Sequence, residues 1–283
     1  MLKQSLPDLR KKIDTIDTAI LSLLKERMDI VKQVGKLKSS EAQIEDRSET
    51  KSFMRPGREA RLIRKLIKQN NHTYPAKTII SIWRNIISAS VFKEQPFNVG
   101  ILNSTSDCGH FIRQHFGAFI HVDLFSDISS LIDSIVSDSD LKRSKTCQIG
   151  ILPYSELGKW GFEFYETLKL KQIYIFSRIP FSDEPLECGA YLALTYIDPE
   201  ASGDDRSIVF ISTKPGCSKE TLIQSLLKQG YTARVIAVQH EQFIVEMHGF
   251  WVQNLDADAI ITKSGGLITD ILPLGAYAVP IKE

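Results

Sequence analysis

The chain has 283 residues, of which 43% are hydrophobic and 24% are charged, and its formal net charge is +1. This length favours two or three domains, and the composition is typical of a globular protein. There is no run of about 18 apolar residues that would predict a membrane span. The first residues lack the apolar core of a secretory signal, so we expect a cytoplasmic protein. The four cysteines are far apart without a CxxC pair, which disfavours a disulfide framework or a zinc site.

A long helix is predicted for residues 5–38, where apolar side chains recur every three or four positions from Leu6 to Leu37. At about 1.5 Å per residue this helix would be roughly 50 Å long. A short domain cannot cover a stripe of that length, so we expect it to pair with another chain. Residues 39–57 are polar and end in Pro-Gly, which predicts a loop.

Two further helices, at about 58–70 and 75–94, complete an all-α three-helix domain over residues 1–95. Beyond it, strand-like runs alternate with helical patterns, which indicates an α/β segment over 96–203. Between residues 98 and 229, strands are predicted at 98–102, 118–124, 148–152, 172–176, 191–196 and 207–212. Helices are predicted at 107–116, 128–137 and 219–229. A polar Ser-Gly-Asp-Asp run at 202–205 predicts a boundary. Residues 204–283 then read as an α+β, ferredoxin-like βαββαβ domain.

The helical domain is basic, with 20 Lys and Arg against 11 Asp and Glu in residues 1–95. Such a domain attracts small polyanions or nucleic acid, although its few aromatic residues disfavour stacking on bases. Arg27 and Lys38 are eleven residues apart, close to three turns, and therefore share one helix face where they can bracket a small dianion. Ser90 and Glu94 share a face of the third helix. Considered singly, each of these charges is typical of a solvated surface.

The sequence from 6 to 38 resembles the first helix of the all-helical chorismate mutases. Their pattern L-R-x-x-I-D-x-I-D, L-L-x-x-R, V-G-x-x-K is matched by Leu9 to Asp17, Leu23 to Arg27 and Val34 to Lys38. Arg58-Glu59 matches the pair that opens the family's second helix, and IWRNIISASVFKE (82–94) matches its third-helix signature. The resemblance implies a homodimer with interlocked helices. It also implies an isomerase that converts chorismate to prephenate, in aromatic amino-acid biosynthesis, without a cofactor or metal.

The resemblance also implies roles for seven side chains. The implied catalytic residues are Arg27, Lys38 and Glu94, and the implied substrate-binding residues are Arg10 from the other subunit, Arg58, Glu59 and Ser90. Two positions depart from the family pattern. Glu94 stands where many relatives carry glutamine, and it donates a hydrogen bond only when protonated, so we expect activity to fall as pH rises. Arg55 stands where relatives are often acidic, which weakens one contact to the substrate hydroxyl.

The remaining two thirds resemble a truncated prephenate dehydratase. Residues 148–158 are similar to the dehydratase run G-V-V-P-I-E-N-S, but its last triplet reads Ser155-Glu156-Leu157. The Thr-Arg-Phe motif falls on AYLALTY (190–196), which holds no Thr-Arg pair. These departures favour an accessory or regulatory region over a second active site.

The end of the chain resembles an ACT amino-acid-binding domain. The similarity lies in residues 212–231 and in the closing strand LPLGAYAVPI at 272–281. It makes an amino-acid effector a candidate partner, beside chorismate and prephenate at the helical domain. Two alternatives to the mutase with an accessory module stay open: a bifunctional mutase–dehydratase, and a non-catalytic regulatory dimer. We expect neither a nucleic-acid nor a membrane partner.

Overall fold

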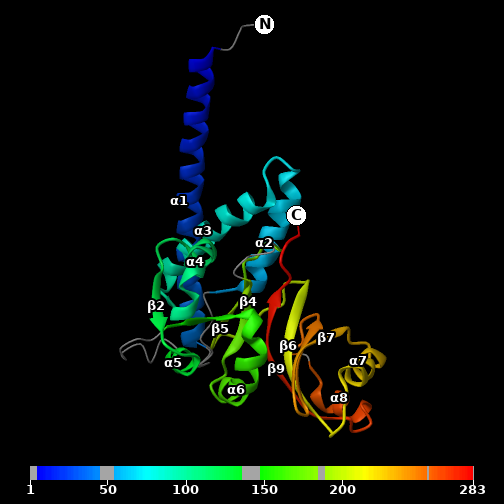
Figure 1. Cartoon of the computed structure of the whole chain (residues 1–283). Coiled ribbons are helices and arrows are strands. Elements are labelled where there is room, and N and C mark those ends of the chain that lie inside the picture. The colour runs from blue at the N-terminus through cyan, green and yellow to red at the C-terminus, as the bar shows by residue number, and fades with distance from the viewer. Residues whose placement is uncertain (1–4, 45–53, 136–146, 184–188, 254, 283) are drawn as a thin grey trace. The chain divides into compact units, whose positions relative to one another are not determined.

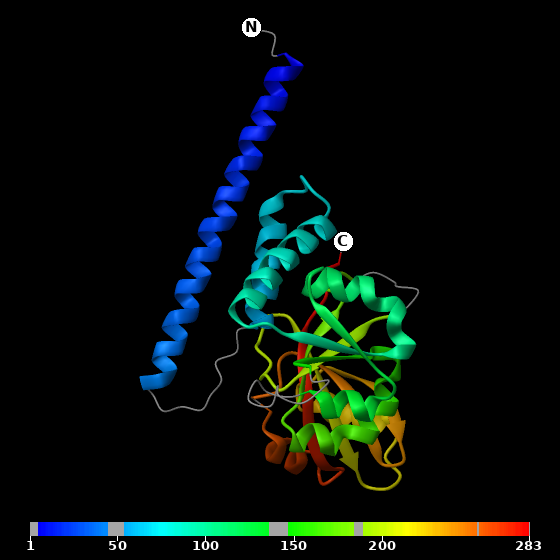
Figure 2. The same ribbon diagram turned by 90° about the vertical axis from the view of Figure 1, so that its left-hand side faces the viewer.

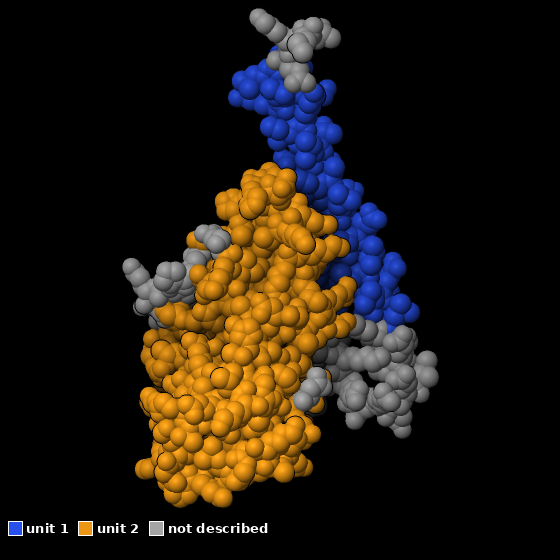
Figure 3. Space-filling model, turned by 90° about the vertical axis from the view of Figure 1, so that its right-hand side faces the viewer, with its two compact units in different colours: residues 1–53, 90–96 blue, residues 54–89, 97–283 orange. Residues whose placement is uncertain are grey.

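The computed structural model describes residues 5–44, 54–135, 147–183, 189–253 and 255–282. In chain order its elements (Figure 1) are α1 (Leu6–Ile44), α2 (Pro56–Asn70), α3 (Ala76–Glu94), β1 (Asn98–Leu102), η1 (Asn103–Cys108), α4 (Gly109–Phe116), β2 (His121–Phe125), α5 (Ile128–Ser134), β3 (Ile149–Pro153), η3 (Tyr154–Glu156), α6 (Leu157–Leu170), β4 (Tyr174–Ile179), β5 (Tyr191–Thr195), β6 (Asp205–Thr213), α7 (Lys219–Lys228), β7 (Ala233–Gln239), β8 (Gln242–His248), α8 (Ala257–Lys263) and β9 (Ile268–Ala278). They divide into two compact units (Figure 3): unit 1 is residues 1–53 with 90–96, and unit 2 is residues 54–89 with 97–283. The division falls inside α3.

The first helix, α1, is a continuous run of 39 residues (Figure 2). Its start is closed by Ser5 and Asp8, because the Ser5 hydroxyl accepts from the Asp8 N–H and the Asp8 carboxylate accepts from the Ser5 N–H. The prediction of a loop over residues 39–57 is wrong for residues 39–44, which belong to α1. No Gly or Pro follows Lys38 in that stretch, and Glu41 and Ala42 are good helix formers. Residues 45–53 lie outside the described part of the chain.

The second and third helices confirm the prediction of a three-helix segment. Helix α2 starts two residues earlier than predicted, with Pro56 in the first turn, where its fixed φ suits a helix. It ends at Asn70 and is followed by Asn71, whose φ of 48° is the left-handed conformation that stops helices. Helix α2 buries Gly57, Ala60 and Ile63 on one face. Helix α3 spans Ala76–Glu94, as the sequence predicted to within one residue.

Unit 2 contains one nine-stranded sheet within the described residues, in the order β2-β1-β3-β5-β4-β9-β6-β8-β7. Strands β2, β1 and β3 are parallel neighbours, whereas β5 runs antiparallel to β3 and β4. The last four strands in the order, β9-β6-β8-β7, pair antiparallel throughout. With α7 and α8 as the two crossovers, this is the split βαβ arrangement, so the ferredoxin-like prediction for residues 204–283 is confirmed.

The two halves of the sheet join where β4 and β9 run parallel, with Ile175 opposite Gly275. Gly275 has a φ of 140°, and a Cβ at this position would overlap the backbone of Ile175. Only glycine therefore permits this approach of the two strands. The strands predicted for 96–203 and for 204–283 thus belong to one sheet, while the domain boundary at 203 stays a prediction.

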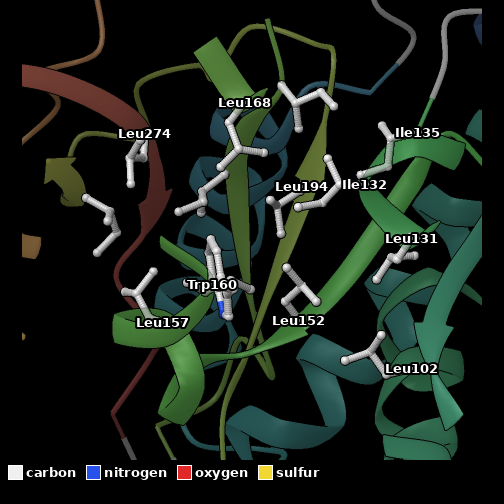
Figure 4. Close-up of a cluster of buried hydrophobic side chains, with 14 of the residues drawn as sticks. Leu102, Leu131, Ile132, Ile135, Leu152, Leu157, Trp160, Leu168, Leu194 and Leu274 are labelled. Carbon is white, nitrogen blue, oxygen red and sulfur yellow. The ribbon is translucent and has the colours of Figure 1, made fainter. Parts of the chain in front are cut away.

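Helices cover both faces of the β9-β6-β8-β7 part of the sheet (Figure 1). Ile208, Phe210 and Ile244 pack in one cluster with residues of α6, whereas the alternate residues Val209 and Val245 pack in a second cluster with α7 and α8. This alternation is the period-2 pattern of a strand with two buried faces. The α6 side is centred on Trp160, which is fully buried among leucines (Figure 4) and donates its ring N–H to the Pro153 carbonyl at 3.0 Å.

Helix α6 was not predicted from the sequence. It contains Gly158 and Gly161, which lower helix propensity. Both glycines face the sheet: a Cβ on Gly158 would clash with Ala237, and one on Gly161 would press on Ile244. The residues that weaken the helical signal are therefore those that allow α6 to lie close to the strands. None of the helices in the described residues combines the length and hydropathy that a bilayer crossing requires.

Candidate active site

Unit 1 brings Arg27 of α1 and Ser90 of α3 into direct contact. The Arg27 Nη1 donates to the Ser90 Oγ at 2.6 Å, and this bond joins residues 63 positions apart in the sequence. Ser90 is 4% exposed, whereas Arg27 is half-buried. This bond fixes the Arg27 guanidinium beside α3, and a guanidinium is a side chain that binds carboxylates well. The pairing was not predicted, although both residues were singled out as substrate-binding or catalytic.

Glu94 lies one helical turn beyond Ser90 and packs against Gly35 of α1. A Cβ added to Gly35 would lie 3.7 Å from the Glu94 Cδ and 3.8 Å from its Oε2, and Gly35 itself is buried. The small residue thus lets a carboxyl group rest on the surface of α1. Lys38 is three residues after Gly35 in the same helix and so shares its face, but its side chain lies outside the described part of the structure.

Arg10 is exposed on the N-terminal half of α1, seventeen residues before Arg27. On an ideal helix this spacing turns Arg10 roughly 100° away from Arg27 around the axis. The geometry agrees with the expectation that Arg10 does not serve the Arg27 pocket of its own subunit. Its assignment to the pocket of a second subunit stays a prediction.

Arg58 and Glu59 belong to unit 2, at the start of α2. The Arg58 side chain is exposed. Glu59 is half-buried and already has two partners: its Oε2 accepts from the Arg84 Nη1 at 2.9 Å, and its Oε1 accepts from the Arg55 N–H at 3.3 Å. The Glu59 carboxylate therefore sits at a helix N-terminus, where negative charge is stabilised. Arg55, which stands where relatives are often acidic, supplies the N–H that precedes α2.

The partner of Glu59, Arg84, was missed at the sequence level. It is 5% exposed and lies over the Phe181 ring, 5.0 Å from the centroid. Burial lowers the pKa of Arg84, and the adjacent Glu59 carboxylate offsets part of that effect. Burial and the Arg84 charge together hold the pKa of His115 well below its ordinary value, so this histidine is neutral. One positive charge therefore remains here, and Glu59 neutralises it.

The N-terminus of α2 is held by Glu200, which follows β5 in the chain. The Glu200 carboxylate accepts from Arg55 at 2.5 Å, from the backbone N–H of Arg58 at 3.1 Å, and from Arg61 at 3.3 Å. Gly57 packs so closely here that a Cβ would overlap the carbonyls of residues 200 and 201. Burial raises the pKa of Glu200, but the bonds and charges of the arginines outweigh this, and the net pKa is lowered. The segment carrying Arg58 and Glu59 is thus anchored to the C-terminal region.

A long helix followed by two shorter ones, with an arginine–serine pair and a carboxyl group between the first and third, is the helix order and residue set that the sequence indicated. The comparison with known families makes this specific. Residues 9–95 match the model of chorismate mutase type II, a range that contains all seven candidate residues from Arg10 to Glu94. The N-terminal part of this chain is therefore a chorismate mutase type II domain.

Individual relatives agree with that domain. The chain is 28% identical over 155 residues to the bifunctional chorismate mutase/prephenate dehydratase of Aquifex aeolicus, covering 53% of this chain and 39% of the relative. It is 30% identical over 116 residues to the protein of the same description from Neisseria gonorrhoeae, covering 40% of this chain and 28% of the relative. The chain thus spans well under half the length of these relatives. A solved prephenate dehydratase from Streptococcus mutans, 12% identical, covers 66% of this chain and 100% of its own with a TM-score of 0.41.

Proposed function

We propose that the protein is a chorismate mutase, which converts chorismate to prephenate in the biosynthesis of phenylalanine and tyrosine in the cytoplasm. The C-terminal region is accessory or regulatory. The observation that carries the proposal is that the match to chorismate mutase type II contains every candidate residue. The direct contact of Arg27 with Ser90 in unit 1 supports it.

The chemistry suits a pocket of fixed cations. In the rearrangement one carbon–oxygen bond breaks while one carbon–carbon bond forms, in a single cyclic step without a proton transfer. The protein therefore has two tasks: to hold chorismate in its compact diaxial conformer, and to stabilise the negative charge that grows on the ether oxygen. Neither task needs a nucleophile or a metal ion.

The seven residues divide these tasks between them. Arg27 binds one substrate carboxylate and is held in place by Ser90, which lines the pocket near the ring carboxylate. Arg58 supports Arg27, and Arg10 of the second subunit binds the other carboxylate. Lys38 and Glu94 donate to the ether oxygen from its two sides, and Glu59 accepts from the ring hydroxyl.

A homodimer is part of this proposal. The apolar residues of α1 that face no partner in the described structure include Ile13, Ile16, Ile20 and Leu23, each about half exposed or more. A second copy of α1 would bury this stripe and bring its Arg10 to the pocket. Such a pairing uses the same surface on both subunits, as a two-fold dimer requires.

A second candidate function is that of a bifunctional mutase–dehydratase. It is favoured by the Aquifex aeolicus relative, because the 155 aligned residues exceed the length of the mutase match. It is opposed by the residues in the dehydratase motifs, which are Ser155, Glu156 and Leu157 in one and lack the Thr-Arg pair in the other. We therefore place the catalytic function in the helical domain alone.

The test follows chorismate by its ultraviolet absorbance and separates the products by chromatography. We expect prephenate from the wild type, and Arg27→Ala to lose roughly 10²–10³-fold in kcat/KM because one preorganised donor is gone. Arg113→Ala, which removes an exposed arginine of α4, is the matched control and should keep full activity. Phenylpyruvate formed without acid would support the bifunctional candidate instead. Chorismate left untouched by the wild type would refute catalysis and leave a regulatory dimer.

A further inference from the structure

A cavity of about 440 Å³ lies in unit 2 at one end of the sheet, remote in sequence from every mutase residue. The side chains at its floor come from neighbouring strands in register: Arg206 is opposite His248 on β8 and opposite Tyr277 on β9. Arg206 and Ile208 are two residues apart on β6, so their side chains point to the same face of the sheet. This is the face on which α6 packs around Ile208. The cavity occupies the part of that face beyond the start of α6. Its volume is that of a small-molecule site.

A buried carboxylate organises one wall of this cavity. Glu246, 6% exposed, accepts from the Tyr154 hydroxyl at 2.7 Å, from the Tyr277 hydroxyl at 2.5 Å and from the Arg234 Nε at 2.8 Å. Burial raises its pKa, but the three donors outweigh burial and the net pKa is lowered, so Glu246 is ionised. Burial beside this charge raises the pKa of Tyr154 to about 12. The negative charge of Glu246 is therefore fully engaged with Arg234 and the two phenols.

The remaining charges leave the cavity cationic. Among the described residues, its lining contains Arg178, Arg206, Arg234 and Lys282 against Asp183 and Glu246, an excess of two positive charges without counting His248. Arg206 lies 4.0 Å from Glu246 and 3.8 Å from Asp204, beyond hydrogen-bond length in both cases. This excess favours an anionic ligand.

One donor of the lining is buried without a partner. The Arg178 Nη1 has no hydrogen-bond partner among the described residues, and its Nη2 is 3.9 Å from the Asp183 carboxylate. A buried guanidinium N–H left unsatisfied is costly, because it loses its water without gaining an acceptor. An anion in the cavity supplies that acceptor. Val279 and Pro280 complete the lining with apolar surface, which a bare inorganic ion would not use.

From these observations we propose that the cavity is a binding site for a small organic acid, whose carboxylate is held by Arg178 and Arg206 and whose body rests on the apolar lining. The site lies at the opposite end of β6 from residues 212–218, where the resemblance to amino-acid-binding domains begins. It also differs in chemistry, since Glu246 is engaged by three donors and the other carboxylate of the lining, Asp183, is 3.9 Å from Arg178. The ligand is thus an acid anion and not a zwitterionic amino acid.

The site shares its wall with the anchor of α2. Arg64 of α2 donates to the carbonyls of Val279 and Asp204, each at 2.9 Å. Val279 lines the cavity, and Asp204 lies 3.8 Å from Arg206. An anion that attracts Arg206 toward the cavity therefore acts next to the bonds that Arg64 makes. These bonds hold α2, the helix that carries Arg58 and Glu59.

The experiment is calorimetric titration of the full chain with phenylpyruvate, phenylalanine and inorganic phosphate, which separate an organic acid from its amino-acid analogue and from a bare anion. We expect phenylpyruvate to bind, with phenylalanine and phosphate at least tenfold weaker. Arg178→Gln should weaken phenylpyruvate by roughly 10–100-fold, as expected for a lost charge-assisted hydrogen bond. Arg113→Gln, an exposed arginine outside the cavity, should leave its affinity unchanged.

Three results would overturn the proposal: no phenylpyruvate binding up to about 10 mM, equal affinity for phenylalanine or phosphate, or equal loss in Arg113→Gln. Arg206→Gln provides a second test if Arg178→Gln fails to fold, since Arg206 is more exposed, at 23% of its side chain. None of these measurements depends on mutase activity, so the proposal stands or fails separately from the proposed function.

Discussion

The apolar side chains of α1 and those of strands β6 and β8 are spaced with equal regularity, yet only the strands bury theirs. Ile16 of α1 is 58% exposed and Leu23 is 64% exposed, whereas Val209 and Val245 are fully buried. The strands have α6 on one face and α7 with α8 on the other. Helix α1 has part of one face covered by the end of α3, through Arg27 and Gly35.

This contrast separates a self-sufficient fold from an incomplete one. A strand of unit 2 finds its partners within the same chain, and its sequence pattern is satisfied by its own neighbours. The stripe of α1 is about 100° wide on a helix of 39 residues, and burying each isoleucine is worth about 1.5–3 kcal/mol. A surface of this kind is typical of an interaction site. The dimer proposal follows from this surface and not from the sheet.

The largest expected effect comes from breaking the stripe of α1. The double variant Ile16→Asp, Ile20→Asp places charges where a second α1 would pack, and a two-fold dimer carries each change twice. We expect the dimerisation constant to fall by at least about 10³-fold, given about 1.5–3 kcal/mol per buried isoleucine. Sedimentation velocity measures it. Mutase activity should fall with it, because Arg10 would no longer reach the second subunit.

The control for this variant is Ser22→Asp, which adds a charge to the same helix outside the apolar stripe. It should sediment and react like the wild type. A wild type that is monomeric at all concentrations, or a double variant that stays dimeric, would contradict the dimer. Loss of the dimer with full activity would show instead that each pocket is complete within one subunit.

The sequence predicted most of the elements because their apolar periods are long and regular. Strand β1 was predicted with its observed bounds, Asn98–Leu102, and the βαββαβ order of the last domain was correct. The errors occur where local composition misleads. Residues 39–44 are polar but helical, and α6 carries two glycines that its close packing requires. The joining of both halves in one sheet depends on Gly275, and no periodic pattern marks such a contact.

The candidate site could be predicted only as a set of residues. The order of motifs identified Arg27, Ser90 and Glu94, but not the Arg27–Ser90 bond, because helix periodicity does not fix which turns of two helices meet. No sequence pattern marked Glu200 as a partner of α2, since 142 residues separate it from Arg58. The sequence marked Arg84 weakly, as the single cation within the apolar run IISIWRNII. Contacts between distant segments are thus what the structure adds.

An intermediate effect is expected from removing the anchor of α2. Glu200→Ala deletes the acceptor for the Arg58 N–H and for two arginine side chains. We expect a loss of about 1–2 kcal/mol in the free energy of unfolding, as for a helix cap, and about a tenfold fall in kcat/KM through displaced Arg58 and Glu59. Chemical denaturation and the chorismate assay measure the two. The control Glu163→Ala, which removes an exposed glutamate of α6, should change neither.

The same contact gives a pH dependence with a defined sign. The pKa of Glu200 is lowered in the folded protein, so its carboxylate stabilises the fold above its unfolded pKa and loses this effect as pH falls through the lowered value. The stability difference between wild type and Glu200→Ala should therefore be full at neutral pH and shrink in acid. A difference that is constant down to about pH 3 would contradict the role of the charge.

The smallest expected change in kcat/KM at acidic pH comes from Glu94→Gln. This variant tests whether the proton of the Glu94 carboxyl group is needed. Glutamine donates from its amide at every pH, whereas the glutamate donates to the ether oxygen only while protonated. We expect the two enzymes to agree within about threefold near pH 5, and the wild type to lose about tenfold per pH unit once its carboxyl group is deprotonated. The profile of kcat/KM from pH 5 to pH 8.5 measures this. A flat wild-type profile, or a falling one in Glu94→Gln, would place the titrating group elsewhere, and the carboxyl that rests on Gly35 would then serve packing and not catalysis.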